Sequence, residues 1–155
     1  MTLELPKIVF LDLPAAVLCA MPYEGHRRGC PNLGKKKGCP PCYPLFWDKF
    51  DLSKPIFAIV NEFDLEAHVL RMKLRHPNWS DRQLRNCLYW QPKARKCLRT
   101  MAAAFRLDHP GYLVEFNPEA IGVNVTGTLH EAGLDLEWPP VKVARQVAIA
   151  AIRRY

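Results

Sequence analysis

The sequence lacks any apolar run that approaches the ~18 residues needed for a membrane-spanning helix. Its opening stretch, MTLELPKIVFLDLPAAVLCA, contains acidic residues and prolines and carries a single lysine before its apolar part, unlike a secretory signal peptide. Internal repeats and low-complexity tracts are also missing. These absences argue against a membrane protein and predict a cytoplasmic location, where cysteines are more often metal-bound, redox-active or buried than paired in disulfides.

Several catalytic signatures are missing as well. The histidines form neither an H-x3-H nor an HExxH pattern, so no zinc-peptidase site is expected. The glycines at 25, 29, 34 and 38 are not followed by the Lys-Ser/Thr pair of a nucleotide P-loop. The sequence therefore indicates no catalytic residue and no reaction.

A chain of 155 residues, of which 49% are hydrophobic, suits one domain with a single core. The net charge of +7 is unevenly placed. One group of cations surrounds the cysteines: Arg27, Arg28, Lys35, Lys36 and Lys37. A second group occupies a helix-like segment: Arg82, Arg85, Lys93, Arg95, Lys96 and Arg99. A soluble surface would explain a mild excess, but the clustering favours an anionic partner such as RNA or a nucleotide, and the first group is the predicted substrate-binding set.

Local patterns predict strands at 7–13, 54–63 and 111–116, and helices at 64–76, from Ser80 onward, at 94–105 and up to Gly133. The end of the chain, 141–155, alternates as a strand does, although its alanines would also suit a helix. Residues 20–55 hold most of the Gly and Pro and form a long loop. This succession indicates an α/β fold: a small sheet with helices packed on it and a long Cys/Gly/Pro loop held by a metal. We divide the single metal-binding domain, 1–155, into a cysteine-rich loop 19–44, a helical region 64–105 and a C-terminal motif 117–155.

The cysteine spacing is Cys19-x10-Cys30-x8-Cys39-x2-Cys42. Two intervening residues let both sulfurs of a C-x2-C pair reach one metal, and here they are prolines, which make the turn rigid. The flanking Arg and Lys would offset thiolate charge and are expected to lower thiol pKa values. We therefore predict a metal site at Cys30, Cys39 and Cys42, with Cys19 as the fourth ligand.

The identity of that fourth ligand stays open at this point. Cys19 lies in an apolar run and could belong to the core, and His26, Cys87, Cys97, water or substrate are alternatives. Cys87 and Cys97 are too far apart on a straight helix to share one centre unless Pro92 bends it sharply, so at most one of them can join the site. We expect both to be buried helix cysteines. A dithiol redox motif at CPPC and a plain loop are the remaining alternatives.

The run CPNLGKKKGCPPCYP resembles a family of small cysteine-rich proteins known as predicted metal-binding proteins, whose signature is Cys-Pro-x-Tyr-Gly-Lys-x-x-x-Cys-Pro-Pro. Matching positions are Cys30, Pro31, Gly34, Lys35, Cys39, Pro40 and Pro41. Residues 117–134 resemble the family's Glu-Ala-x-Gly-Ile-Asp-Val segment through Glu119, Ala120, Gly122 and Val125. Family members usually carry a further cysteine group before this segment, whereas 106–116 contains none, so the chain looks like a shortened member. The resemblance implies a bound metal, in the form of an iron–sulfur cluster rather than zinc. It does not indicate which reaction, if any, the protein catalyses.

Two functions follow as hypotheses. The first is a metalloprotein with a [4Fe–4S] cluster that acts on a nucleotide or RNA. The second is a structural zinc with four cysteines that supports a nucleic-acid or protein binding module.

Overall fold

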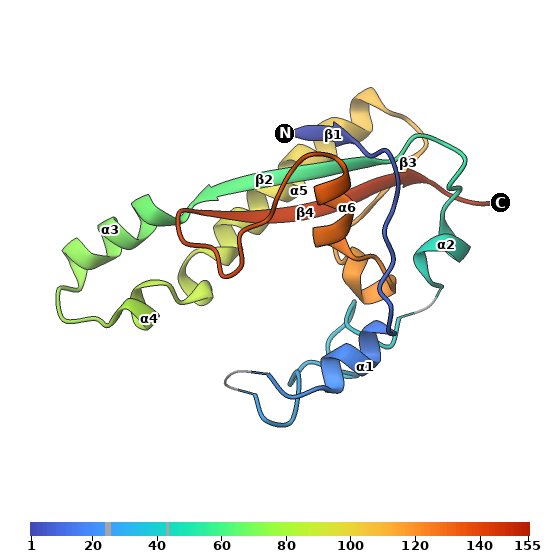
Figure 1. Cartoon of the computed structure of the whole chain (residues 1–155). Helices are drawn as coiled ribbons and strands as arrows, with labels where there is room; N and C mark the ends of the chain where they lie inside the picture. The colour runs from blue at the N-terminus through green and yellow to red at the C-terminus, as the bar shows by residue number, and fades with distance from the viewer. Residues whose placement is uncertain (24–25, 43) are drawn as a thin grey trace.

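The computed structural model describes residues 1–23, 26–42 and 44–155 of the chain (Figure 1). Its helices and strands are, in order, β1 (Thr2–Glu4), α1 (Ala15–Ala20), α2 (Phe46–Lys49), β2 (Phe57–Asp64), α3 (Leu65–Arg75), α4 (Asp81–Leu84), the 3₁₀ helix η1 (Cys87–Tyr89), α5 (Gln91–Asp108), β3 (Tyr112–Glu115), the 3₁₀ helix η2 (Pro118–Ile121), α6 (Val125–Glu131) and β4 (Val143–Ile152). No helix in the described ranges is long and apolar enough to cross a membrane.

The predicted α/β architecture with a small sheet and packed helices is confirmed. The four strands form an antiparallel sheet in the order β1-β2-β4-β3. The long strands β2 and β4 lie at its centre, with Phe57 opposite Ala150 and Asp64 opposite Val143. Both are rich in Val, Ile and Ala, which suits strands covered on two faces.

One face of the sheet is covered by α5, which Figure 1 shows running along it. Ala94, Leu98, Ala102 and Phe105 recur at helical spacing and are buried on the side of the helix that meets the sheet. The small side chains of Ala148 and Ala150 let the helix pack onto β4. Pro92 lies in the first turn of α5 rather than before the helix, which is where a missing backbone N–H is tolerated.

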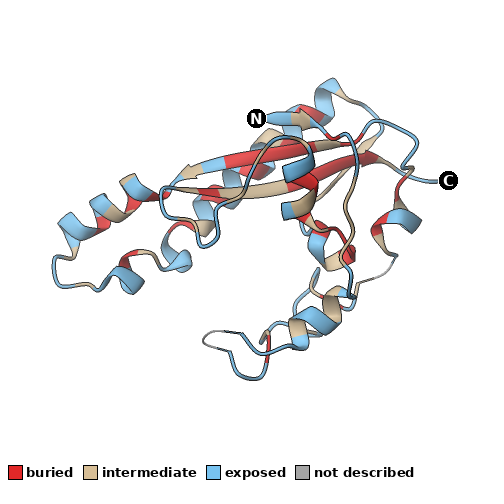
Figure 2. Ribbon diagram, viewed as in Figure 1, coloured by how far each residue is buried: buried red, intermediate tan, exposed pale blue. Residues whose placement is uncertain are grey.

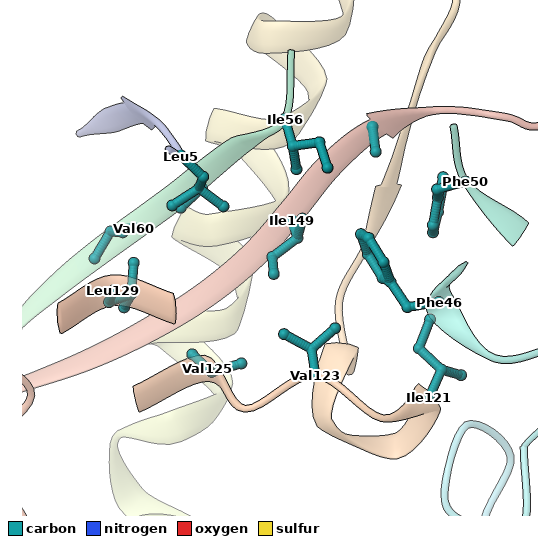
Figure 3. Close-up of a cluster of buried hydrophobic side chains, with 12 residues drawn as sticks. Leu5, Phe46, Phe50, Ile56, Val60, Ile121, Val123, Val125, Leu129 and Ile149 are labelled. Carbon is teal, nitrogen blue, oxygen red and sulfur yellow. The ribbon is translucent and has the colours of Figure 1, made fainter. Parts of the chain in front are cut away.

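The opposite face carries the largest apolar cluster (Figure 3). Val60 and Ile149 project from the sheet toward Val123 and Leu129, while Phe46 of α2 fills the cluster at one end. Thr128 of α6 is fully buried and accepts a hydrogen bond from the backbone N–H of Val9 at 3.0 Å. The N-terminal segment is thereby attached to α6.

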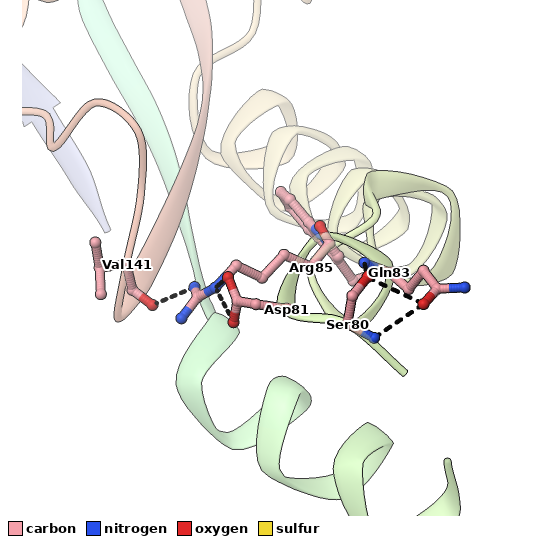
Figure 4. Close-up of polar contacts among 6 residues, drawn as sticks. Ser80, Asp81, Gln83, Arg85 and Val141 are labelled. Carbon is pink, nitrogen blue, oxygen red and sulfur yellow. Dashed lines mark hydrogen bonds and ion pairs between the residues drawn. The ribbon is translucent and has the colours of Figure 1, made fainter. Parts of the chain in front are cut away.

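The predicted helix starts at Asp64 and Ser80 are confirmed. The Asp64 carboxylate caps α3 by accepting from the N–H of Ala67 at 2.8 Å. Ser80 and Gln83 form a capping box, although α4 spans a single turn. Arg85 then joins this region to the start of β4 because it binds the Asp81 carboxylate at 3.0 Å and the carbonyl of Val141 at 3.0 Å (Figure 4).

The predicted strand at 7–13 is wrong. Strand β1 is formed by Thr2–Glu4 instead, and the later segment makes only an isolated bridge between Phe10 and Val123. Pro6 offers no N–H for the ladder, and beyond it the chain leaves the sheet to run along η2 and α6. The expected loop 20–55 contains the one-turn helix α2, and the strand expected within 141–155 is confirmed as β4.

Candidate metal centre

Residues 14–44, which we call the cysteine segment, contain α1 and all four cysteines of the predicted site. The segment lies to one side of the sheet and is largely exposed (Figure 2). Among its described residues only Gly29 and Pro40 are buried, and only the partly buried Cys42 packs against the hydrophobic core. Apolar burial therefore contributes little to holding the segment in shape.

Backbone hydrogen bonds bring Cys19 and Cys30 together. The N–H of Cys30 donates to the carbonyl of Cys19 at 2.7 Å. Gly29 makes this approach possible, because it has a φ of +76° and a Cβ at this position would lie 2.6 Å from the Cys19 carbonyl oxygen. The end of α1 is thus fixed against Cys30 and Pro31, where the next turn begins.

A second set of backbone bonds folds Cys39 back toward Cys30. The N–H of Leu33 donates to the carbonyl of Cys30 at 3.2 Å, and that of Gly34 donates to the carbonyl of Pro40 at 2.8 Å. The Cys42 thiol donates to the carbonyl of Cys39 at 3.0 Å. Direct hydrogen bonds therefore join Cys19 to Cys30 and Cys39 to Cys42, and the bond between Gly34 and Pro40 connects the two pairs.

The thiols act on one another electrostatically. Burial raises the pKa of Cys19, and the charges of Cys30 and Cys39 raise it further. Burial, followed by Cys39 and Glu115, also raises the pKa of Cys42, with Lys49 opposing. The expectation that Arg27, Arg28 and the lysines lower thiol pKa values is wrong for these two cysteines, since neighbouring thiolates and burial outweigh the surface cations.

In the ranges 1–23, 26–42 and 44–155, no three side chains of His, Cys, Asp or Glu converge closely enough to hold a metal ion. The donor set itself still fits one: it consists of four thiols on one segment, two of which are in a C-x2-C pair. The Cys42 S–H bond is one that metal binding would replace, because a thiolate ligand has no proton to donate.

The C-terminal motif comes into contact with the cysteine segment. A Cβ on Gly38 would lie 3.1 Å from the Asn117 side-chain nitrogen. A cavity of about 310 Å³ is lined by Pro40, Pro41 and Cys42 from one segment and by Ala120 and Gly122 from the other. The two stretches on which the family resemblance rests therefore lie side by side, although about eighty residues separate them in sequence.

The predicted substrate-binding cations divide into two groups. Lys36 and Lys37 line a second cavity, of about 210 Å³, next to Cys39. Arg27, Arg28 and Lys35 are exposed and line none of the cavities described here. Arg95 and Arg99 of α5 line this second cavity too. Both belong to the second basic group of the sequence, but nothing in the sequence indicates that this group meets the lysines.

The alternative fourth ligands lie apart from this arrangement. Cys87 and Cys97 are both exposed, so the expectation of buried helix cysteines is wrong. Cys87 belongs to η1, beside α4 and away from α1 (Figure 1). His26 is exposed and its ring lies 4.8 Å from that of Tyr23, whose pKa is raised by burial and by the adjacent Cys30.

A larger cavity, of about 340 Å³, lies at the opposite end of the sheet and is lined by Trp90, Gln146 and the loop before β4. It contains no cysteine, and we place no site there.

Comparison of the chain with protein-family models, with characterised proteins and with solved structures gives no match. The resemblance to the predicted metal-binding proteins therefore depends on the motif residues alone.

Proposed function

We propose that the chain is a metalloprotein whose cysteine segment binds a [4Fe–4S] cluster through Cys30, Cys39 and Cys42, with Cys19 as the fourth ligand. The observation that carries the proposal is the character of the segment: it holds four cysteines, and among its described residues only Cys42 packs against the hydrophobic core. A stretch of this length without its own core needs another source of order, and a metal bound by thiolates supplies it.

The family resemblance supports iron–sulfur over zinc, and the contact between the two motif segments supports the resemblance. When bound, such a cluster supplies electron transfer or, at an iron free of protein ligands, Lewis-acid chemistry. The chain's own contribution is to hold the ligands. The Cys19–Cys30 backbone bond and the bond from Gly34 to Pro40 hold three of the four cysteine positions near one another. The proposal includes a cytoplasmic location, where thiols stay reduced.

The test is metal analysis of protein purified without oxygen. We expect iron and sulfide in about a four-to-four ratio and a brown solution with broad absorbance near ~400 nm. Cys30→Ala, Cys39→Ala and Cys42→Ala should each lose the cluster, and Cys19→Ser should leave one that oxygen destroys faster.

Cys87→Ala and Cys97→Ala are the matched controls, because they remove exposed thiols outside the segment. They should keep full metal content. Equal metal content in all the variants would refute the site. A colourless protein with about one zinc per chain would show that the site holds a structural zinc and no iron–sulfur cluster.

A further inference from the structure

The two basic groups of the sequence meet in one cavity. Lys36 and Lys37 come from the cysteine segment, and Arg95 and Arg99 come from one face of α5, where residues four apart are neighbours. About sixty residues separate the two pairs in sequence. Asn117 borders the same cavity, and its side chain lies close to Gly38, where an added Cβ would be 3.1 Å from the side-chain nitrogen.

The cavity is strongly positive and lacks a counter-charge. Its lining includes four cations and no Asp or Glu. None of the ion pairs formed within the described ranges involves these four side chains. Arg95 donates one N–H to the Gln91 amide at 3.1 Å, which leaves most of its five donors free. Four like charges around one hollow repel one another, so an anion bound between them is stabilised.

Glu115 directly precedes Phe116 and Asn117 of the cavity lining, and its carboxylate already has two partners. Glu115 accepts from Lys49 at 2.8 Å and from the backbone N–H of Asn117 at 3.1 Å. It therefore leaves the cations of the cavity without a partner from the strand that precedes Asn117.

We propose that this cavity binds the phosphate group of a nucleotide-type ligand beside the metal centre. Two arginines provide paired donors that match phosphate geometry, and the lysines add compact charge. The volume of about 210 Å³ is below that of most small-molecule sites, so the cavity takes the phosphate end and leaves the rest of the ligand outside. Phe116, which is 39% exposed and lines the rim, offers a flat surface to a base.

The role of this ligand as substrate rests on the proposed function, because Cys39 lines the same cavity and is a proposed metal ligand. The binding site itself depends only on the cations. Phosphate binding and metal binding can therefore fail separately.

The test measures binding of pyrophosphate, AMP and a fluorescent decauridylate to the full chain at low salt. The variant is Arg95→Gln/Arg99→Gln, and the matched control is Lys93→Gln/Lys96→Gln, which removes the same charge from exposed positions of α5 outside the cavity. Because each lost charge-assisted contact weakens binding about tenfold or more, the arginine variant should raise the Kd for AMP and pyrophosphate roughly 100-fold. The control should stay within about threefold, since Lys93 and Lys96 do not line the cavity and act on a bound anion only through solvent-screened charge.

Competition identifies the source of the phosphate. If AMP displaces the decauridylate, the cavity takes phosphates of RNA as well; if the decauridylate does not bind, the ligand is a small nucleotide. No binding of AMP or pyrophosphate by the parent, or an equal loss in variant and control, overturns the proposal. Metal content measured on the same samples separates the two proposals. If the parent binds AMP but contains no metal, only the cluster proposal fails. If it contains the metal but binds neither AMP nor pyrophosphate, only the phosphate-site proposal fails.

Discussion

Gly29 is the position at which the geometry of the cysteine segment can be disturbed without touching a thiol. In Gly29→Ala, the new Cβ would lie 2.6 Å from the Cys19 carbonyl oxygen and 2.7 Å from that of Ala20, so the backbone has to move. A non-glycine residue in the left-handed region costs about 1–2 kcal/mol, and loss of the Cys30–Cys19 hydrogen bond costs about 0.5–1.5 kcal/mol more. We expect the segment to be destabilised by about 2–3 kcal/mol, which raises its opening equilibrium roughly 30- to 150-fold.

Gly34→Ala is the matched control. Its φ of +68° imposes the same backbone cost, but nothing lies within 4 Å of the added Cβ. Limited proteolysis under native conditions should cleave the Gly29→Ala variant within residues 14–44 about two- to tenfold faster than the control, because the control does not lose the Cys30–Cys19 hydrogen bond. Metal retention should fall in the same order. The thermal transition of the sheet should change little, because among the described residues of the segment only Cys42 packs against the core. Equal cleavage rates and metal contents in the two variants would refute the close packing of Cys30 on Cys19.

Two further predictions concern the sheet and its helices. Phe46→Ala should lower the free energy of unfolding by about 3–5 kcal/mol in urea titrations, because the side chain is fully buried in the main cluster; a loss below about 1 kcal/mol would contradict that packing. Burial, followed by the charge of Arg71, lowers the pKa of His68, so the unfolded chain binds its proton more readily and stability falls as pH drops from the ordinary histidine pKa toward the lowered one. His68→Leu should reduce the stability difference between pH 7.5 and pH 5.5, and an unchanged difference would show that His68 does not titrate as a buried group.

Local signals predicted those parts of the fold that local chemistry decides. Strand β4 follows from alternating Val and Ile, and the starts of α3 and α4 follow from side chains that cap the next turn. The strand expected at 7–13 failed because β-branched content reports a fit to a half-buried surface and does not select a pairing partner. Thr2–Glu4 pairs with the free edge of β2, and the backbone N–H of Val9 donates to Thr128 of α6 instead of to a strand.

The candidate site divides in the same way. The spacing of Cys30, Cys39 and Cys42 is a local property, and it was readable in the sequence. The meeting of Lys36 with Arg99 depends on how the cysteine segment lies against α5, and no spacing rule carries that information. The direction of the Cys19 and Cys42 pKa shifts also escaped prediction, because it depends on which charges end up within reach of each thiol.

The register of the sheet has a consequence for how the molecule opens. Strands β1 and β3 both pair near the Phe57 and Ala150 ends of the central strands, so four strands overlap there, while Asn61–Asp64 and Val143–Gln146 form a two-stranded ribbon. A two-stranded ribbon is only marginally stable by itself and depends here on Trp90 and Leu65 packed against Ala144. Such a molecule opens in cooperative units of different free energy. The ribbon, with α3 and α4 attached, forms one unit that can fray while the four-stranded end, next to which the cysteines and the basic cavity lie, stays closed.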